Sequence, residues 1–166
     1  FVKNCGAARY AFNFALESKK SAFDKKEKIP SGFDISKKLN ILKKTDPKLS
    51  LWAYEVGSHS FEYGIENCEK AFENFFRNCK KKIKGKKGFP KFKSRKNNKE
   101  KFSTRASISL TGKKGKNVSV GKSHLKIPRI GKIKLKQQDY IPQGTKIRSV
   151  TVSSSANRWF ASCLCE

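Results

Sequence analysis

Residues 58–79 read SHSFEYGIENCEKAFENFFRNC, and this stretch decides the fold of the N-terminal half. Its apolar residues recur at intervals of four and three, the repeat of one face of an α-helix. They are Phe61, Ile65, Cys68, Phe72, Phe75 and Cys79. The opposite face is polar, and Glu66–Lys70 and Glu73–Arg77 are spaced for i,i+4 ion pairs. The pattern predicts a long amphipathic helix from about Ser58 to Asn78.

Two further helices are predicted upstream. Phe1, Cys5, Ala8, Phe12 and Ala15 repeat the same spacing, so a helix is expected from residue 1 to about residue 29, before Pro30. Asp34 or Ser36 is expected to cap a second, shorter helix that ends near 46–47, an Asp-Pro pair. Three helices with short connections predict a small helical bundle.

Beyond residue 101 the apolar period changes to two, which is typical of β-strands. The alternating residues are Ala106, Ile108 and Leu110; Val118 and Val120; Ile133 and Leu135; Ile147, Val150 and Val152; and the run 159–165. The slip between Ile147 and Val150 suggests a bulge. Turn signals at 112–115, 142–144 and 155–157 separate the strands. Five or six short antiparallel strands predict a barrel or sandwich. The predicted fold class is therefore α+β: a helical bundle at 1–80, a basic linker at 81–101 and a β-barrel at 102–166.

The charge is large and unevenly distributed. The 166 residues hold 39 Lys and Arg against 13 Asp and Glu, a net charge of +26. Residues 1–76 carry 13 basic and 10 acidic groups, whereas 77–101 carry 13 and 1. Such an excess of one sign costs self-repulsion, and a polyanionic partner is the usual reason for it. No long apolar run is present, so membrane binding is disfavoured and a nucleic-acid partner is expected.

The residue types that perform catalysis are scarce. His59 and His124 are isolated, and Asp139 is the one interior carboxylate after residue 100. A metal-dependent nuclease needs two or more carboxylates to hold its ions, so no catalysis and no cofactor are expected within these residues. The five cysteines at 5, 68, 79, 163 and 165 form no CxxC pair. They are expected to be reduced thiols, with Cys163 and Cys165 packed on one face of a strand, in a cytosolic protein.

The lysines after residue 76 are not organised by an apolar stripe, so they are interpreted as phosphate contacts. The residues expected to contact the nucleic-acid backbone are Arg9, Arg77, Lys80, Lys81, Lys82, Lys84, Lys86, Lys87, Lys91, Lys93, Arg95, Lys96, Lys126, Arg129, Lys132 and Lys134. A second basic series alternates with apolar residues, which predicts one basic and one buried strand face. It consists of Lys122, Lys126, Arg129, Lys132, Lys134 and Lys136. Phe89 and Phe92 flank Pro90 and either stack on bases or anchor the loop in the core; anchoring is favoured.

Five segments, in order, resemble the TnpB family of transposon-encoded, OrfB-type RNA-guided nucleases, which are related to type V CRISPR effectors. They are GAARYAFN (6–13), SKKLNILK (36–43), KAFENFFR (70–77), KGFPKFK (87–93) and LKIPRIG (125–131). The resemblance implies a helical, helix-turn-helix-like recognition domain beside an oligonucleotide-binding-like wedge barrel. The first barrel strand would lie upstream of Phe1. The RuvC-like catalytic acids with their Mg²⁺, and a zinc ribbon, would lie downstream. The absence of Met and the start at Phe1 also predict a piece of a longer protein.

The resemblance implies binding of guide RNA, the RNA–DNA hybrid and a short DNA motif beside the target, as a monomer associated with the nucleoid. By position, Ser58, His59, Glu62, Thr104 and Ser107 would face that motif. Glu62 departs from the family, where Gln is common. Two alternatives remain: a stand-alone RNA-binding module like a ribosomal protein, and the DNA-binding domain of a conventional transposase or recombinase.

Overall fold

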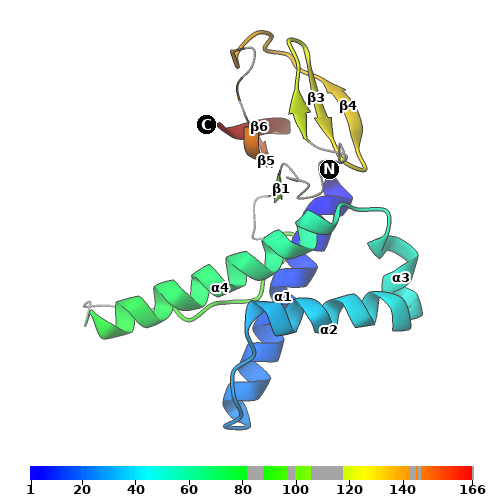
Figure 1. Ribbon diagram of the computed structural model, residues 1–166. Helices are drawn as coiled ribbons and strands as arrows, with labels where there is room; N and C mark the ends of the chain where they lie inside the picture. Colours follow the sequence, from blue (N-terminus) through cyan, green and yellow to red (C-terminus); the bar gives the residue numbers. More distant parts are fainter. Residues whose placement is uncertain (82–87, 97–99, 106–117, 143–144, 146, 166) are drawn as a thin grey trace.

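In the computed structural model the chain is α+β, with helices and strands segregated along the sequence (Figure 1). The structure describes residues 1–81, 88–96, 100–105, 118–142, 145 and 147–165. The helices described are α1 (Val2–Asp24), α2 (Gly32–Thr45), α3 (Pro47–Ala53) and α4 (Ser58–Lys80). The strands described are β1 (Lys101–Arg105), β2 (Ser119–Val120), β3 (His124–Ile127), β4 (Gly131–Lys134), β5 (Ile147–Ser155) and β6 (Arg158–Cys165).

The long helices match their predicted periodicity, but several ends differ. α1 ends at Asp24 and not near residue 29. Ser31, not Asp34 or Ser36, caps α2: its hydroxyl accepts from the Asp34 amide, and the Asp34 carboxylate accepts from the Ser31 amide. The Ser31 hydroxyl also donates to the Asp34 carboxylate at 2.6 Å, and this bond, together with the one from the Ser31 amide, lowers the pKa of Asp34. This reciprocal capping box places Asp34 at the third helical position, which is why it resembled a cap in the sequence.

The short helix α3 is absent from the sequence prediction. Asp46 and Pro47 were interpreted as the end of α2, yet they also begin α3. The Asp46 carboxylate accepts from the amides of Lys48 and Leu49, and Pro47 occupies the first helical turn. Proline is favoured at that position because the amide it lacks would have no helical partner there. Together with α3 there are four helices in the described chain, not three.

α1 and α4 pack closely enough to need a glycine at their contact. A Cβ atom on Gly64 would lie 2.3 Å from the carbonyl oxygen of Ala8 and 2.8 Å from the Cβ of Ala11. The close approach buries the predicted stripe of α4 as far as Phe72. Phe75 and Cys79 are only half-buried, because α4 projects beyond α1 at its C-terminal end (Figure 1).

A buried lysine joins α1, α4 and the loop between α1 and α2. Lys19 is 6% exposed, and its Nζ lies 2.6 Å from Oε1 of Glu69, a close ion pair that is not aligned as a hydrogen bond. The same Nζ donates a 2.8 Å hydrogen bond to the carbonyl of Pro30. A buried charge is tolerated only when it is paired in this way, so these contacts hold the three segments together.

The strands form two antiparallel sheets, with orders β1-β5-β6 and β2-β3-β4. In the part of the chain that the structure describes, they do not join into the predicted closed barrel. The predicted strand at 106–110 and the turn at 112–115 lie outside the described residues. β3 was not predicted as a separate strand. The predicted slip is confirmed: the β5–β6 register shifts between Ile147 and Ser149.

The turn between β5 and β6 is also confirmed. Ala156 and Asn157 both have positive φ, 46° and 58°, as a two-residue hairpin turn of the type I′ class requires. A second core lies between the helices and the sheets: Cys5 and Ala8 of α1 pack with Phe102, Val150 and other strand residues. The N-terminal part of α1 therefore belongs to both cores.

The thiols differ in their surroundings. Cys5 and Cys68 are at most 2% exposed, and burial raises the pKa of each to about 11. Cys163 is half-buried, but Cys165 is exposed, so the prediction that both are packed is wrong for Cys165. Cys163 packs against the second core, whereas Cys165 is the last residue of β6 and is not part of that core.

Replacing Gly64 by Ala is expected to lower the free energy of unfolding by about 3 kcal/mol, since overpacking costs roughly 1–3 kcal/mol and the atoms met here are mainly backbone. Urea unfolding followed by circular dichroism measures this. Gly6→Ala is the matched control, because its Cβ would meet nothing within 4 Å and alanine favours the helix. Equal stabilities of the two variants would contradict the close contact.

At pH 8.5 iodoacetamide is expected to alkylate Cys165 first and Cys68 at least about 100-fold more slowly. The thiolate is the reactive form, and raising the pKa of Cys68 from the usual 9.0 to about 11 lowers its thiolate fraction about 100-fold. Mass spectrometry of timed samples gives the rates, and unfolding in urea should make them equal. Rapid alkylation of Cys68 in the folded chain would show that it is not buried.

Candidate nucleic-acid interface

The β3–β4 hairpin has one buried and one basic face, as predicted. The apolar residues of β3 are 2% exposed. The other face carries the directly opposed pairs Lys126–Lys132 and His124–Lys134. Like charges opposite one another destabilise a sheet. Within the described residues these lysines make no ion pair, so a bound anion would reduce their repulsion.

Arg129 lies in the turn of the same hairpin. It is exposed and has a positive φ of 68°, a left-handed conformation uncommon for residues other than glycine, asparagine and aspartate. Gly131, with φ of 97°, completes the turn. The turn therefore places an exposed arginine at the end of the hairpin. Lys126, Arg129, Lys132 and Lys134 are brought together here and are called the hairpin face below.

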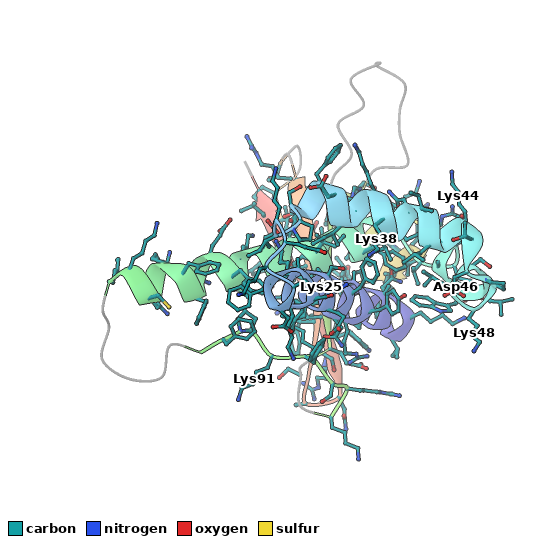
Figure 2. The ribbon with its side chains drawn as sticks, turned by 90° about the horizontal axis from the view of Figure 1, so that it is seen from below. Lys25, Lys38, Lys44, Asp46, Lys48 and Lys91 are labelled. Carbon is teal, nitrogen blue, oxygen red and sulfur yellow. The ribbon has the colours of Figure 1, made fainter. Side chains whose placement is uncertain are left out.

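The other predicted phosphate contacts lie elsewhere. Arg77, Lys80 and Lys81 surround the C-terminal end of α4, where Arg77 donates to Asn74 Oδ1 at 2.7 Å. Lys82, Lys84, Lys86 and Lys87 lie outside the described residues. Lys91 and Lys96 are exposed, and Figure 2 shows that Lys91 and the lysines of the helices are spread over this side of the molecule. No comparable cluster forms there among the described residues.

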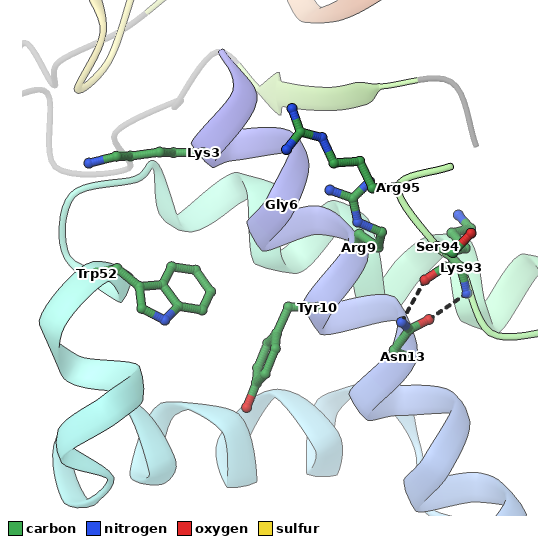
Figure 3. A pocket seen from close by; sticks show the side chains of 9 residues that line it. All are labelled: Lys3, Gly6, Arg9, Tyr10, Asn13, Trp52, Lys93, Ser94 and Arg95. Atoms are coloured by element: carbon green, nitrogen blue, oxygen red, sulfur yellow. Dashed lines mark hydrogen bonds between the residues drawn. The ribbon is translucent and has the colours of Figure 1, made fainter. Parts of the chain in front are cut away.

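Lys93, predicted as a phosphate contact, is half-buried and holds its segment against α1. Its backbone amide donates to Asn13 Oδ1 at 2.8 Å, and its carbonyl accepts from Asn13 Nδ2 at 2.9 Å (Figure 3). Its Nζ lies 3.8 Å from the centre of the Phe12 ring, and burial lowers the pKa of this lysine. Asn13 thereby clasps the segment after α4 onto α1.

The predicted anchoring is only partly met at Phe89, which contacts the helices but is 45% exposed, and is not met at Phe92. The Phe89 ring lies 5.6 Å from Phe72 and 5.3 Å from Phe75, edge to face, and Pro90 is buried. Phe92 is 51% exposed and makes no ring contact with the described residues. The segment is thus fixed at Pro90 and Lys93, with Phe92 exposed between them.

A groove opens between α1, α3 and this clasped segment (Figure 3). Its volume is about 480 Å³, and it is lined by Lys3, Gly6, Arg9, Tyr10, Asn13, Trp52, Lys93, Ser94 and Arg95. Of these, Arg9, Lys93 and Arg95 were predicted as binding residues. Lys3, Tyr10 and Trp52 were not. Residues 3, 6, 10 and 13 are spaced to lie on one face of α1, so this part of the lining could have been grouped from the sequence. Trp52 could not, because it lies on α3, a helix that the sequence did not predict.

The residues expected to face a target-adjacent motif are only partly together. Ser58 is exposed at the start of α4, and His59 Nδ1 lies 2.8 Å from Glu62 Oε2 one turn on. Thr104 is 5% exposed on β1, so its hydroxyl is not at the surface. Ser107 lies outside the described residues. The structure therefore groups Ser58, His59 and Glu62.

No group of three or more metal-ligating side chains occurs among the described residues. None of the helices described is long and apolar enough to cross a membrane. No known family model matches the chain, and no curated protein matches its sequence.

Asn13→Ala is expected to release the clasped segment. Its two hydrogen bonds to Lys93 contribute about 1 kcal/mol each, so their loss should raise the fraction of molecules with a detached segment roughly 30-fold. Tryptic cleavage after Lys91 and Lys93 should rise by the same factor. Mass spectrometry of brief digests measures the cleavage. Asn67→Ala is the control, because Asn67 bonds only the Tyr63 carbonyl of its own helix. The same cleavage rate in both variants would contradict the clasp.

Proposed function

We propose that this chain binds nucleic acid through the phosphate backbone, as the recognition and wedge portion of a TnpB-like RNA-guided DNA endonuclease. Its ligands would be a guide RNA, the RNA–DNA hybrid and the DNA beside the target. The observation that carries the proposal is the hairpin face, where four cations gather without a carboxylate partner among the described residues. In such effectors base pairing supplies the sequence specificity, so backbone contacts are what the protein must provide.

The resemblance supports the same assignment from another direction. Three of its five segments contain residues that contribute to the structures described above: Asn13 of the first clasps Lys93 of the fourth, and Arg129 of the fifth lies in the turn of the hairpin face. We propose only a binding role for this chain, and assign to it none of the family's nuclease residues or metal ions.

The finer fold prediction, an oligonucleotide-binding-like barrel, also belongs to this proposal. Among the described strands β6 is at a sheet edge, and Trp159, Phe160 and Leu164 are 37%, 52% and 59% exposed. Pairing of β6 with a further strand would cover this apolar surface, and an uncovered edge of this kind is an aggregation hazard.

The test is binding of the chain to a structured RNA, an RNA–DNA hybrid and a random DNA duplex at matched salt, followed by fluorescence anisotropy. Tighter binding to the RNA and the hybrid is expected. Equal affinity for all three would leave only non-specific phosphate binding and would overturn the proposal. Absence of binding to any of them would overturn nucleic-acid binding itself.

Replacing Lys126 and Lys132 together by Ala is expected to make the log–log salt slope for the hybrid shallower by about 1.8, near 0.9 for each lost phosphate contact. Stability should not fall, because the variant removes a like-charge pair. The control is Lys38→Ala with Lys48→Ala, two exposed lysines of α2 and α3 (Figure 2). A slope equally changed in the control would mean that net charge, not the hairpin face, determines binding.

A further inference from the structure

The groove beside α1 combines two kinds of surface. Its cations, Lys3, Arg9 and Arg95, lie along one rim, and its aromatic residues, Tyr10 and Trp52, form the opposite wall (Figure 3). A volume of about 480 Å³ falls within the roughly 300–1,000 Å³ typical of pockets for small organic molecules. The groove can therefore admit one planar group together with an anion.

The aromatic wall is held in place by the core. The Trp52 ring is stacked against the buried Phe61 at 5.8 Å and meets Tyr10 edge to face at 5.6 Å. Tyr10 in turn is parallel to Phe14 at 6.4 Å. Both wall residues remain partly exposed. Rigid aromatic rings with accessible surface are what bases of unpaired nucleotides stack on.

The cationic rim is available for an anion. Arg9 has no carboxylate partner among the described residues, and no carboxylate belongs to the lining. Arg95 is 3.7 Å from Glu100 Oε1, but its side chain is 75% exposed. Lys3 pairs with Glu55. Asp46 lies close enough to Tyr10 to help burial raise its pKa, so a phosphate is favoured at the arginine end and the base at the tyrosine end.

The floor of the groove is Gly6, whose missing side chain leaves the space open. A Cβ there would meet nothing within 4 Å. Gly6 is in the interior of α1, where glycine disfavours the helix relative to alanine. A side chain at this position would stabilise α1 and fill the groove, so the glycine costs helix stability and leaves the groove accessible.

We propose that this groove holds one unpaired nucleotide of a bound RNA strand, with its base against Tyr10 and Trp52 and its phosphate between Arg9 and Arg95. The proposal rests on the proposed function and adds a site that reads single-stranded RNA by stacking. Bases inside a duplex are paired and stacked on one another, so they cannot enter a concave groove of this size. The hairpin face, by contrast, suits phosphates of either form.

The experiment compares two probes with the whole chain at fixed salt: a fluorescent octauridylate and an RNA duplex of equal phosphate number. Gly6→Leu is expected to weaken binding of the octauridylate about 10-fold or more, the loss typical of one stacked base, and to leave duplex affinity within about 2-fold. Gly6→Ala adds only one methyl group and is the graded comparison, so it should weaken octauridylate binding less than Gly6→Leu does and leave duplex affinity unchanged. Circular dichroism should show that both variants are folded, because Leu and Ala favour helix over Gly.

Two further arms make the outcome specific. Arg9→Gln should weaken the octauridylate more than Lys20→Gln, an exposed cation further along α1. An abasic octamer should bind the unaltered chain about as weakly as octauridylate binds Gly6→Leu, with no further loss in that variant. Octauridylate affinity unchanged in folded Gly6→Leu would overturn the groove proposal, as would equal loss for both probes. Binding of a fluorescent acidic phosphopeptide that Gly6→Leu abolishes, with octauridylate affinity unchanged in that variant, would assign the groove to a peptide. Failure of the unaltered chain to bind either probe would instead overturn the proposed function.

Discussion

The contact between α1 and α4 at Gly64 is the constraint on which the rest of the molecule depends. Because no side chain separates the helices there, Phe61, Ile65 and Cys68 reach the core and the buried Lys19 reaches Glu69. The same approach sets the position of Trp52 through its stack on Phe61. It also places Asn13 where it can hold Lys93. Both the groove and the clasped segment follow from one close helix crossing.

The structure separates two ways of meeting a polyanion. The hairpin face presents cations on a strand surface, with His124 opposite Lys134, an arrangement suited to phosphates regardless of sequence. The groove presents fewer cations next to rigid aromatic rings in a concave site. In the proposed function the first would contribute affinity that falls with salt, and the second would distinguish paired from unpaired strands. Binding of both a guide strand and its hybrid, as proposed, would use both surfaces.

Much of the helical layer could be predicted from the sequence, and the reasons are local. The four-three spacing of Phe61 to Phe72 and the turn at 155–157 depend on residues close in the chain. The hairpin face followed from alternation alone. The groove could not be predicted, because Trp52 lies on a helix whose start signal, Asp46-Pro47, also resembles a stop. The opposite side of the groove includes Arg95, which lies beside α1 because Asn13 binds Lys93, a residue 80 positions away in the sequence. The burial of Lys93 and Thr104 likewise depends on tertiary packing.

The N-terminal half of α1 is used on several sides at once. Ala7 and Ala11 pack in the helical core, Cys5 and Ala8 pack against the strands, and Gly6 and Tyr10 line the groove. A helix with so many occupied sides has few positions that accept substitution freely. In a saturating mutational scan, this short stretch should therefore tolerate fewer changes than the outer face of α2, although it contains mostly small and unremarkable residues. The alanines at 7, 8 and 11 are small because two cores crowd this helix, whereas Gly6 faces open space in the groove.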